Sequence, residues 1–192
     1  MPEVLVISCN PETSSFDHAL ANAYCESARS AGASVNLLDL GTLKFDPILH
    51  HGYKEVQPLE PDLLYAQKLI KAADHIVLVY PSWWGSIPAL FKGFIDRVFL
   101  PGFAFRHHEK DMLWDKLLTG KTARIILTQD SPGWWNWLVY RRSNIHSVKS
   151  ATLQYCGIKP VRVTSINKVG YLTPGQREQW LKKVTLLGGL VK

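Results

Sequence analysis

The sequence has few cysteines and no long apolar run. Its three cysteines, Cys9, Cys25 and Cys156, lie far apart and form no Cys-x-x-Cys pair. An odd and sparse cysteine count excludes a secreted disulfide framework and fits a reducing cytoplasm. No stretch approaches the roughly 18 apolar residues that a membrane span needs, and the N-terminus lacks the charged start and apolar stretch of a signal peptide. We therefore expect a soluble, cytoplasmic protein.

Several motifs that would indicate other ligands are missing. No His-Glu-x-x-His or other Cys/His ligand spacing occurs, so we predict no metal site. No Gly-x-Gly-x-x-Gly occurs, and Gly120-Lys121-Thr122 lacks the earlier glycine of a P-loop. The net charge is +6, but lysines and arginines are spread along the chain. This spread argues against nucleic-acid binding. A net positive charge is, however, consistent with an enzyme that binds phosphorylated cofactors.

The composition is that of an ordinary globular domain, because 46% of the residues are hydrophobic and 20% are charged. Short apolar runs, as expected of strands buried on both faces, alternate with segments of helical periodicity. The predicted strands are 4–7, 35–38, 75–80, 123–128 and 161–166. The predicted helices are 16–31, 60–73, 87–98, 138–156 and one that opens at Thr173-Pro174.

This alternation predicts an α/β fold, a doubly wound five-stranded parallel sheet with helices on both faces. Two segments, 41–60 and 99–120, interrupt the alternation and contain Pro, Gly, His and aromatic residues. We interpret them as surface excursions and not as linkers. The chain 1–192 is therefore predicted to be one domain.

Ligands of such sheets bind beyond the carboxyl ends of the strands, where the strand order reverses. After the first predicted strand, Asn10, Thr13, Ser14 and Ser15 precede a helix. Backbone N–H groups at a helix start, together with neutral side-chain donors, form a phosphate site. An ordinary serine N-cap remains the alternative interpretation of this loop.

Five of the seven tryptophans lie in the loops after the third and fourth predicted strands, at 81–88 and 128–137. The topology places these loops side by side. Two converging aromatic clusters favour a planar ligand such as an isoalloxazine ring. We expect Trp83 and Trp84 to build the ring site and Trp134 and Trp135 to line the acceptor side. Packing at a subunit interface remains the alternative for either cluster.

Two segments carry a family resemblance. One is SFDHAL, at 15–20, which leads into the first helix; the other is PSWWGSIPALFKGFIDRVFLPGFAF, at 81–105. Tyr155-Cys156-Gly157 is a weaker match. With these segments the chain resembles the NAD(P)H:quinone oxidoreductase family of flavodoxin-like proteins, which includes ancillary proteins of bacterial potassium-efflux systems. The order and spacing extend over roughly residues 4–185.

The resemblance implies a flavodoxin-like fold and a set of flavin contacts. These are Asn10, Ser15, Phe16, Asp17, Pro81, Ser82, Trp83, Trp84, Gly85, Asp96, Thr128, Gln129 and Asp130. The last three belong to a loop that departs from the Thr-Gly-Gly of many members. Tyr140 and His146 match, by spacing only, the Tyr and His that assist hydride transfer in some members. The chain lacks the long C-terminal extension of the FAD-binding members, which favours FMN and leaves FAD open.

The resemblance also implies the reaction: a homodimeric, flavin-dependent NAD(P)H:quinone oxidoreductase that works by ping-pong hydride transfer. Two alternatives stay open. One is an azo- or nitro-compound reductase on the same scaffold. The other is a flavin-binding regulatory subunit that associates peripherally with a membrane transporter. Turnover of free quinones by the isolated protein distinguishes the enzyme from the regulatory subunit.

Overall fold

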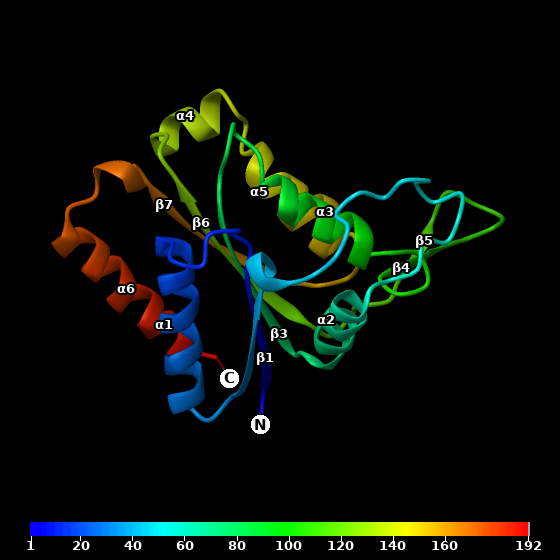
Figure 1. Cartoon of the computed structure of the whole chain (residues 1–192), viewed down its shortest axis with the longest axis horizontal. Helices are drawn as coiled ribbons and strands as arrows, with labels where there is room; N and C mark the ends of the chain where they lie inside the picture. The colour runs from blue at the N-terminus through cyan, green and yellow to red at the C-terminus, as the bar shows by residue number, and fades with distance from the viewer. Residues whose placement is uncertain (192) are drawn as a thin grey trace.

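The computed structural model describes residues 1–191 and contains a five-stranded parallel sheet (Figure 1). Its strands are β1 (Glu3–Ser8), β2 (Ser34–Asp39), β3 (His75–Pro81), β6 (Thr122–Gln129) and β7 (Val161–Asn167). Their order is β2-β1-β3-β6-β7, and every neighbouring pair is parallel. The chain runs outward from β1 to β2 and returns to place β3 on the other side of β1. The strand order thus reverses between β1 and β3, as the predicted fold class requires.

The central strand β1 is apolar from Val4 to Ile7 because both of its faces are covered. Along β1, Val4 and Val6 are buried in one core, and Leu5 and Ile7 are buried in the core on the opposite face. Alternate side chains of a strand point to opposite faces. A strand between two helical layers therefore needs a continuous apolar run instead of an alternating one.

Two helices cover one face of the sheet, α1 (Phe16–Ser30) and α6 (Pro174–Gly189), which pack against each other. Helix α6 begins with the predicted capping box, in which the Thr173 hydroxyl accepts from the N–H of Gln176 and the Gln176 side chain accepts from the N–H of Thr173. Gly32, at φ +89°, follows the end of α1. A short 3-10 turn, Val169–Tyr171, connects β7 to α6.

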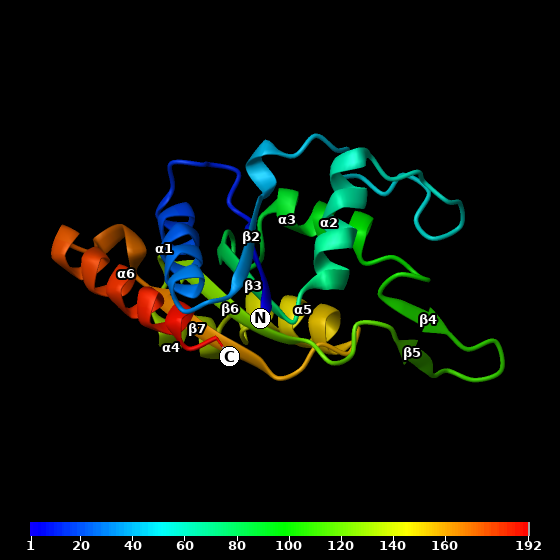
Figure 2. The same ribbon diagram turned by 90° about the horizontal axis from the view of Figure 1, so that it is seen from below.

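The other face is covered by α2 (Pro61–Ala72), α3 (Ala89–Val98) and α5 (Ser143–Val148) (Figure 2). The prediction of a helix near 138–156 holds for 143–154, where α5 continues directly into a π-helical turn at Lys149–Gln154. It fails for 139–142, which separate α5 from a preceding short helix, α4 (Gly133–Leu138). Arg141 and Arg142 separate α4 from α5, and their positive φ angles of 49° and 55° are incompatible with a continuous helix.

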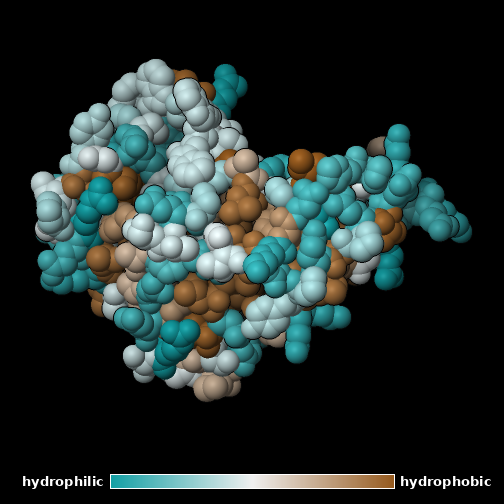
Figure 3. All heavy atoms as spheres, in the orientation of Figure 1, coloured by the Kyte–Doolittle hydropathy of each residue, from teal (hydrophilic) through white to brown (hydrophobic). Residues whose placement is uncertain are grey.

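The excursion 99–120 forms a projecting arm with a two-stranded antiparallel hairpin, β4 (Phe105–His107) and β5 (Trp114–Lys116) (Figures 1 and 2). The surface of the arm is largely hydrophilic (Figure 3). Its base is not a surface feature, however, because Ala104, Phe105 and Leu118 are buried in the core. The prediction of a surface excursion therefore holds for the tip and fails for the base.

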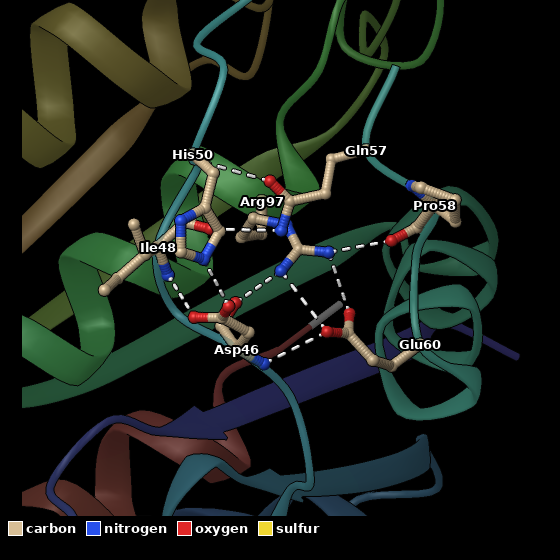
Figure 4. Close-up of polar contacts among 7 residues, drawn as sticks. All are labelled: Asp46, Ile48, His50, Gln57, Pro58, Glu60 and Arg97. Carbon is tan, nitrogen blue, oxygen red and sulfur yellow. Dashed lines mark hydrogen bonds and ion pairs between the residues drawn. The ribbon is translucent and has the colours of Figure 1, made fainter. Parts of the chain in front are cut away.

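The excursion 41–60 begins with a 3-10 turn, Leu40–Thr42, and is attached to α3 by a buried cation (Figure 4). Arg97 is fully buried, and one of its Nη atoms lies 2.9 Å from the Glu60 carboxylate and 2.9 Å from the Pro58 carbonyl oxygen. Its other Nη donates to the Asp46 carbonyl. The Glu60 carboxylate also accepts from the N–H of Asp46, at 3.0 Å. One guanidinium thus ties the start and the end of this excursion to the helix that follows β3.

No helix within residues 1–191 is long and apolar enough to cross a membrane. Cys9, Cys25 and Cys156 are all free and buried. Burial raises the pKa of the Cys9 thiol well above its usual range, which makes Cys9 a small core residue and not a nucleophile.

Candidate functional site

Two adjoining cavities lie at the carboxyl edge of the sheet, where β1, β3 and β6 end. The smaller has a volume of about 210 Å³ and the larger about 660 Å³. They share Ser82, Trp83 and Asp130 in their walls. The smaller is also lined by Asn10, Glu12, Ser15, Phe16, Asp17, Pro81, Thr128, Gln129 and Val169. The larger is also lined by Trp84, Gly85, Ser131 and Tyr140.

A buried carboxylate organises the smaller cavity. Asp17 accepts hydrogen bonds from the Thr128 hydroxyl, at 2.6 Å, and from the Asn10 amide, at 2.9 Å. These contacts join the loops that follow β1 and β6. Burial raises the pKa of the Asp17 carboxyl, and the two hydrogen bonds offset part of that rise. Asp17 therefore fixes the shape of the cavity, and its buried oxygens are already engaged by protein donors.

The start of α1 supplies the donors of this cavity. Ser15 is the N-cap residue, and its hydroxyl accepts from the N–H of His18 at 3.3 Å. The first turn of a helix has N–H groups without intrahelical partners, and the helix dipole adds partial positive charge there. No Lys or Arg within residues 1–191 lines the cavity, and Glu12 and Asp130 contribute carboxylates to it. A phosphate ester held here would thus depend on neutral donors, in agreement with the sequence-based prediction of this chemistry.

The loop after β3 makes a tight turn at the mouth of the larger cavity. Trp83 and Ser86 exchange both backbone hydrogen bonds, each at 3.0 Å. The two residues between them, Trp84 and Gly85, have φ angles of +53° and +70°, the geometry of a type I′ turn. Trp84 at the tip is fully exposed, whereas Trp83 lines both cavities. Trp83 is thus better placed than Trp84 to contact a ligand that spans the two.

Tyr140 forms the wall of the larger cavity opposite this turn. A Cβ added to Gly85 would lie 3.0 Å from the Tyr140 ring, closer than an ordinary contact, and the φ of +70° at this position also favours glycine. The Tyr140 ring is in turn edge-on to the Trp135 ring of α4, with centroids 6.4 Å apart. The two tryptophan-rich loops therefore meet through Tyr140, as their predicted proximity requires.

Four predicted site residues lie outside both cavities. Trp134 and Trp135, expected to line the acceptor side, line neither cavity and are exposed on α4. Asp96 is on α3, where its carboxylate pairs with Lys92 at 2.7 Å. His146 is exposed on α5. The other predicted contacts and Tyr140 line one cavity or both.

Residues 2–185 match the family described as having the flavodoxin-like fold. The chain belongs to this family. The membership agrees with the strand order and with the resemblance seen in the two sequence segments. It also explains why a cleft lies at the point where the strand order reverses, which is the ligand position of flavodoxin-like sheets.

Homologues of the chain in this family include NAD(P)H dehydrogenases that act on quinones. The chain is 27% identical to NAD(P)H dehydrogenase [quinone] 1 of Cavia porcellus, over 94% of the chain and 75% of that protein. It is 32% identical to an uncharacterized NAD(P)H oxidoreductase of Haemophilus influenzae, over 82% of the chain and 79% of that protein.

Solved structures show the same fold at lower identity. The NAD(P)H:quinone oxidoreductase of Methanothermobacter marburgensis superposes with a TM-score of 0.81 at 22% identity, and the match covers 98% of each chain. An FMN-dependent NADH-azoreductase of Bacillus anthracis, in complex with FMN, superposes with a TM-score of 0.74 at 18% identity, also over 98% of each chain. Both comparisons establish the flavodoxin-like architecture.

The sequence interpretation did not identify Asn144, which connects three loops of the site. Its side-chain amide donates to the Ser82 hydroxyl at 2.8 Å and to the Gln129 side chain at 3.2 Å. The Gln129 amide donates onward to Asn167, at 2.7 Å. Asn144 is fully buried on α5. A lone asparagine in a predicted helix carries no local signal of this role, since its partners lie in other loops.

Proposed function

We propose that the protein is a flavin-dependent NAD(P)H:quinone oxidoreductase, with FMN as the flavin and FAD as the alternative. The observation that carries the proposal is the pair of joined cavities. The smaller offers neutral donors at the start of a helix, and the larger is walled by Trp83 and Tyr140. A phosphate group suits the first and a flat ring suits the second. The quinone-reducing homologues support the choice of reaction.

The residues present fit a flavin. The cap at Ser15 and the N–H groups of the first turn of α1 would hold its phosphate. Trp83 and the backbone of the turn at Trp84 and Gly85 would hold its ring, because backbone N–H groups can donate to the polar ring edge. When bound, the flavin supplies the capacity to take up a hydride from a nicotinamide and to release two electrons to a quinone.

The protein's own part in this proposal is to position the reactants and to exclude water. The network through Asn144 fixes the loops after β3 and β6 relative to each other, so the walls of the larger cavity are preorganised. Tyr140, whose hydroxyl can donate a hydrogen bond, is the one candidate catalytic residue that lines this cavity. His146 and Asp96 stay secondary candidates because they lie outside it. We also propose a homodimer, in which the exposed tryptophans of α4 contribute to the contact.

Steady-state kinetics test the proposed reaction. The larger cavity is a single space of about 660 Å³, so we expect nicotinamide and quinone to occupy it in turn and not together. Rates with both substrates varied should give parallel double-reciprocal lines, and excess quinone should compete with NAD(P)H. Intersecting lines would demonstrate a ternary complex. Bound flavin that NAD(P)H reduces, without turnover of any quinone, would favour the regulatory-subunit alternative.

Substitutions in the two aromatic loops should have separable effects. Trp83→Ala removes a wall of both cavities and should weaken flavin binding by roughly tenfold, as expected for one aromatic contact of about 1–1.5 kcal/mol. Trp135→Ala acts through Tyr140 and should raise the quinone KM while flavin stays bound. Trp137→Ala is the matched control, because Trp137 lies on the same helix and, within the described residues, only Trp135 of the two forms an aromatic pair with Tyr140. Equal flavin loss in the Trp83 and Trp135 variants would remove this division of roles.

A further inference from the structure

A second polar cavity lies at the opposite, amino edge of the sheet, far from the site described above. It has a volume of about 240 Å³ and is lined by residues of β3, β6, β7 and the carboxyl end of α6. Figures 1 and 2 show that this end of α6 lies beside the sheet. Leu187, Leu190 and Val191 form its helical wall, and polar side chains of β3, β6 and β7 form the wall on the sheet. The proposed oxidoreductase reaction gives this cavity no role.

Two arginines stand side by side on the sheet wall. Arg124 of β6 and Arg162 of β7 are directly paired in register, so their side chains leave the sheet on the same face. Neither guanidinium forms an ion pair with a carboxylate of residues 1–191. Two neighbouring positive charges thus face one small cavity without a counter-charge from the described part of the chain.

Arg124 is the less solvated of the two, with an exposed fraction of 8%. One of its Nη atoms donates to the Thr164 hydroxyl at 3.3 Å, but its Nε has no hydrogen-bond partner within the described residues. A buried charged donor without an acceptor is costly. An acceptor that enters the cavity would remove this cost.

The remaining polar groups of the wall are neutral and hydrogen-bonded to one another. His75 contacts the Thr122 hydroxyl through Nδ1, at 2.6 Å, and the Tyr24 hydroxyl through Nε2, at 3.3 Å. Burial, together with the charges of Arg124 and Arg162, lowers the pKa of His75 to about 4. His75 is therefore uncharged at neutral pH, and the part of the wall formed by residues 1–191 carries two positive charges and no carboxylate.

The carboxyl end of α6 works against this charge but does not cancel it. The end of a helix carries roughly half a negative charge, and its effect fades within one turn. Two guanidinium groups carry two full positive charges. The cavity therefore remains electropositive.

We propose that this cavity binds a small oxyanion, a phosphate or carboxylate group, between Arg124 and Arg162. Guanidinium groups match such oxygens in a bidentate manner, and hydrogen bonds between ionised partners are stronger than neutral ones. The anion would accept a hydrogen bond from the Nε–H of Arg124 and would also contact the guanidinium of Arg162 at the rim of the cavity. The volume limits the ligand to the anion and a short organic group.

Inorganic phosphate and malonate are the test probes, added in phosphate-free buffer with chloride used to hold the ionic strength constant. Phosphate should raise the melting temperature of the protein, since a ligand of the native state stabilises it. It should also shift the NMR signal of the Arg124 Nε–H. Arg162→Gln should require roughly tenfold more phosphate for the same response, as expected for the loss of one charge-assisted contact.

Arg106→Gln is the matched control, because Arg106 is an exposed arginine of β4 and its loss changes the net charge equally. It should respond to phosphate as the wild type does. Phosphate that binds at the start of α1 would affect all three proteins alike. A response to malonate equal to that to phosphate would assign the site to oxyanions in general, and a response to phosphate alone would assign it to phosphates. An unmoved Arg124 signal, or an Arg162 variant that responds like the wild type, would overturn the proposal.

Discussion

We expect Arg97→Met to lower the free energy of unfolding by about 3–5 kcal/mol, the largest effect of any single substitution considered for this protein. Methionine keeps the unbranched stem of the side chain but removes the guanidinium and with it every donor. The carbonyls of Asp46 and Pro58 then lose their partner, and Glu60 loses its counter-charge. Each buried acceptor left without a donor costs about 1–3 kcal/mol. Glu60 keeps its hydrogen bond from the N–H of Asp46 and some contact with water. The loss of its counter-charge therefore makes only a limited contribution to the lost free energy of unfolding.

Lys92→Met is the matched control for this substitution. Lys92 also lies on α3 and also pairs with a carboxylate, that of Asp96, but the pair is solvent-exposed. Exposed ion pairs contribute about 0–1 kcal/mol. Denaturant titration of both variants should therefore show a large difference between them. Equal stability of the two variants would contradict the role assigned to Arg97 in attaching the segment 41–60.

We expect Ser15→Asp to weaken FMN binding by about 2 kcal/mol, roughly a thirtyfold rise in Kd. Aspartate is as good an N-cap as serine, so α1 should still begin at the same place. Its carboxylate would, however, stand where the phosphate is proposed to bind, in a cavity whose walls already contain Glu12 and Asp130. The added carboxylate would then repel the phosphate, in addition to any repulsion from Glu12 and Asp130.

Two comparisons separate charge from capping. Ser15→Asn keeps the cap without a charge and should bind FMN nearly as the wild type does. Riboflavin lacks the phosphate, so its affinity should be almost unchanged by Ser15→Asp. Titrations followed by flavin fluorescence measure these five affinities: FMN with the wild type and both variants, and riboflavin with the wild type and Ser15→Asp. If Ser15→Asp leaves the FMN affinity unchanged, Ser15 is only a helix cap.

The sheet could be predicted from the sequence because its signal is local. A strand buried on both faces favours an apolar run, as at 4–7, and each of the five predicted segments became a strand. The segments 35–38 and 161–166 contain polar residues and form the edge strands β2 and β7. The capping box at Thr173 is equally local, and the start of α6 was predicted correctly. The rule that ligands bind at the carboxyl edge then brought Ser15, Trp83 and Thr128 to one site.

What could not be predicted depends on contacts between distant residues. The break at Arg141 and Arg142 has no Gly or Pro signal, since two arginines adopt positive φ there. Asn144 and Arg97 each take partners from loops far along the chain. The pairing of Arg124 with Arg162 depends on the register of β6 and β7, and only the folded sheet determines that register.

The most direct test of the account is the visible spectrum of the purified protein, mixed with FMN and freed of excess cofactor by gel filtration. We expect the flavin absorbance to stay with the protein, to bleach on anaerobic addition of NAD(P)H, and to return when a quinone is added. Protein that elutes without flavin absorbance after exposure to both FMN and FAD would contradict the central claim.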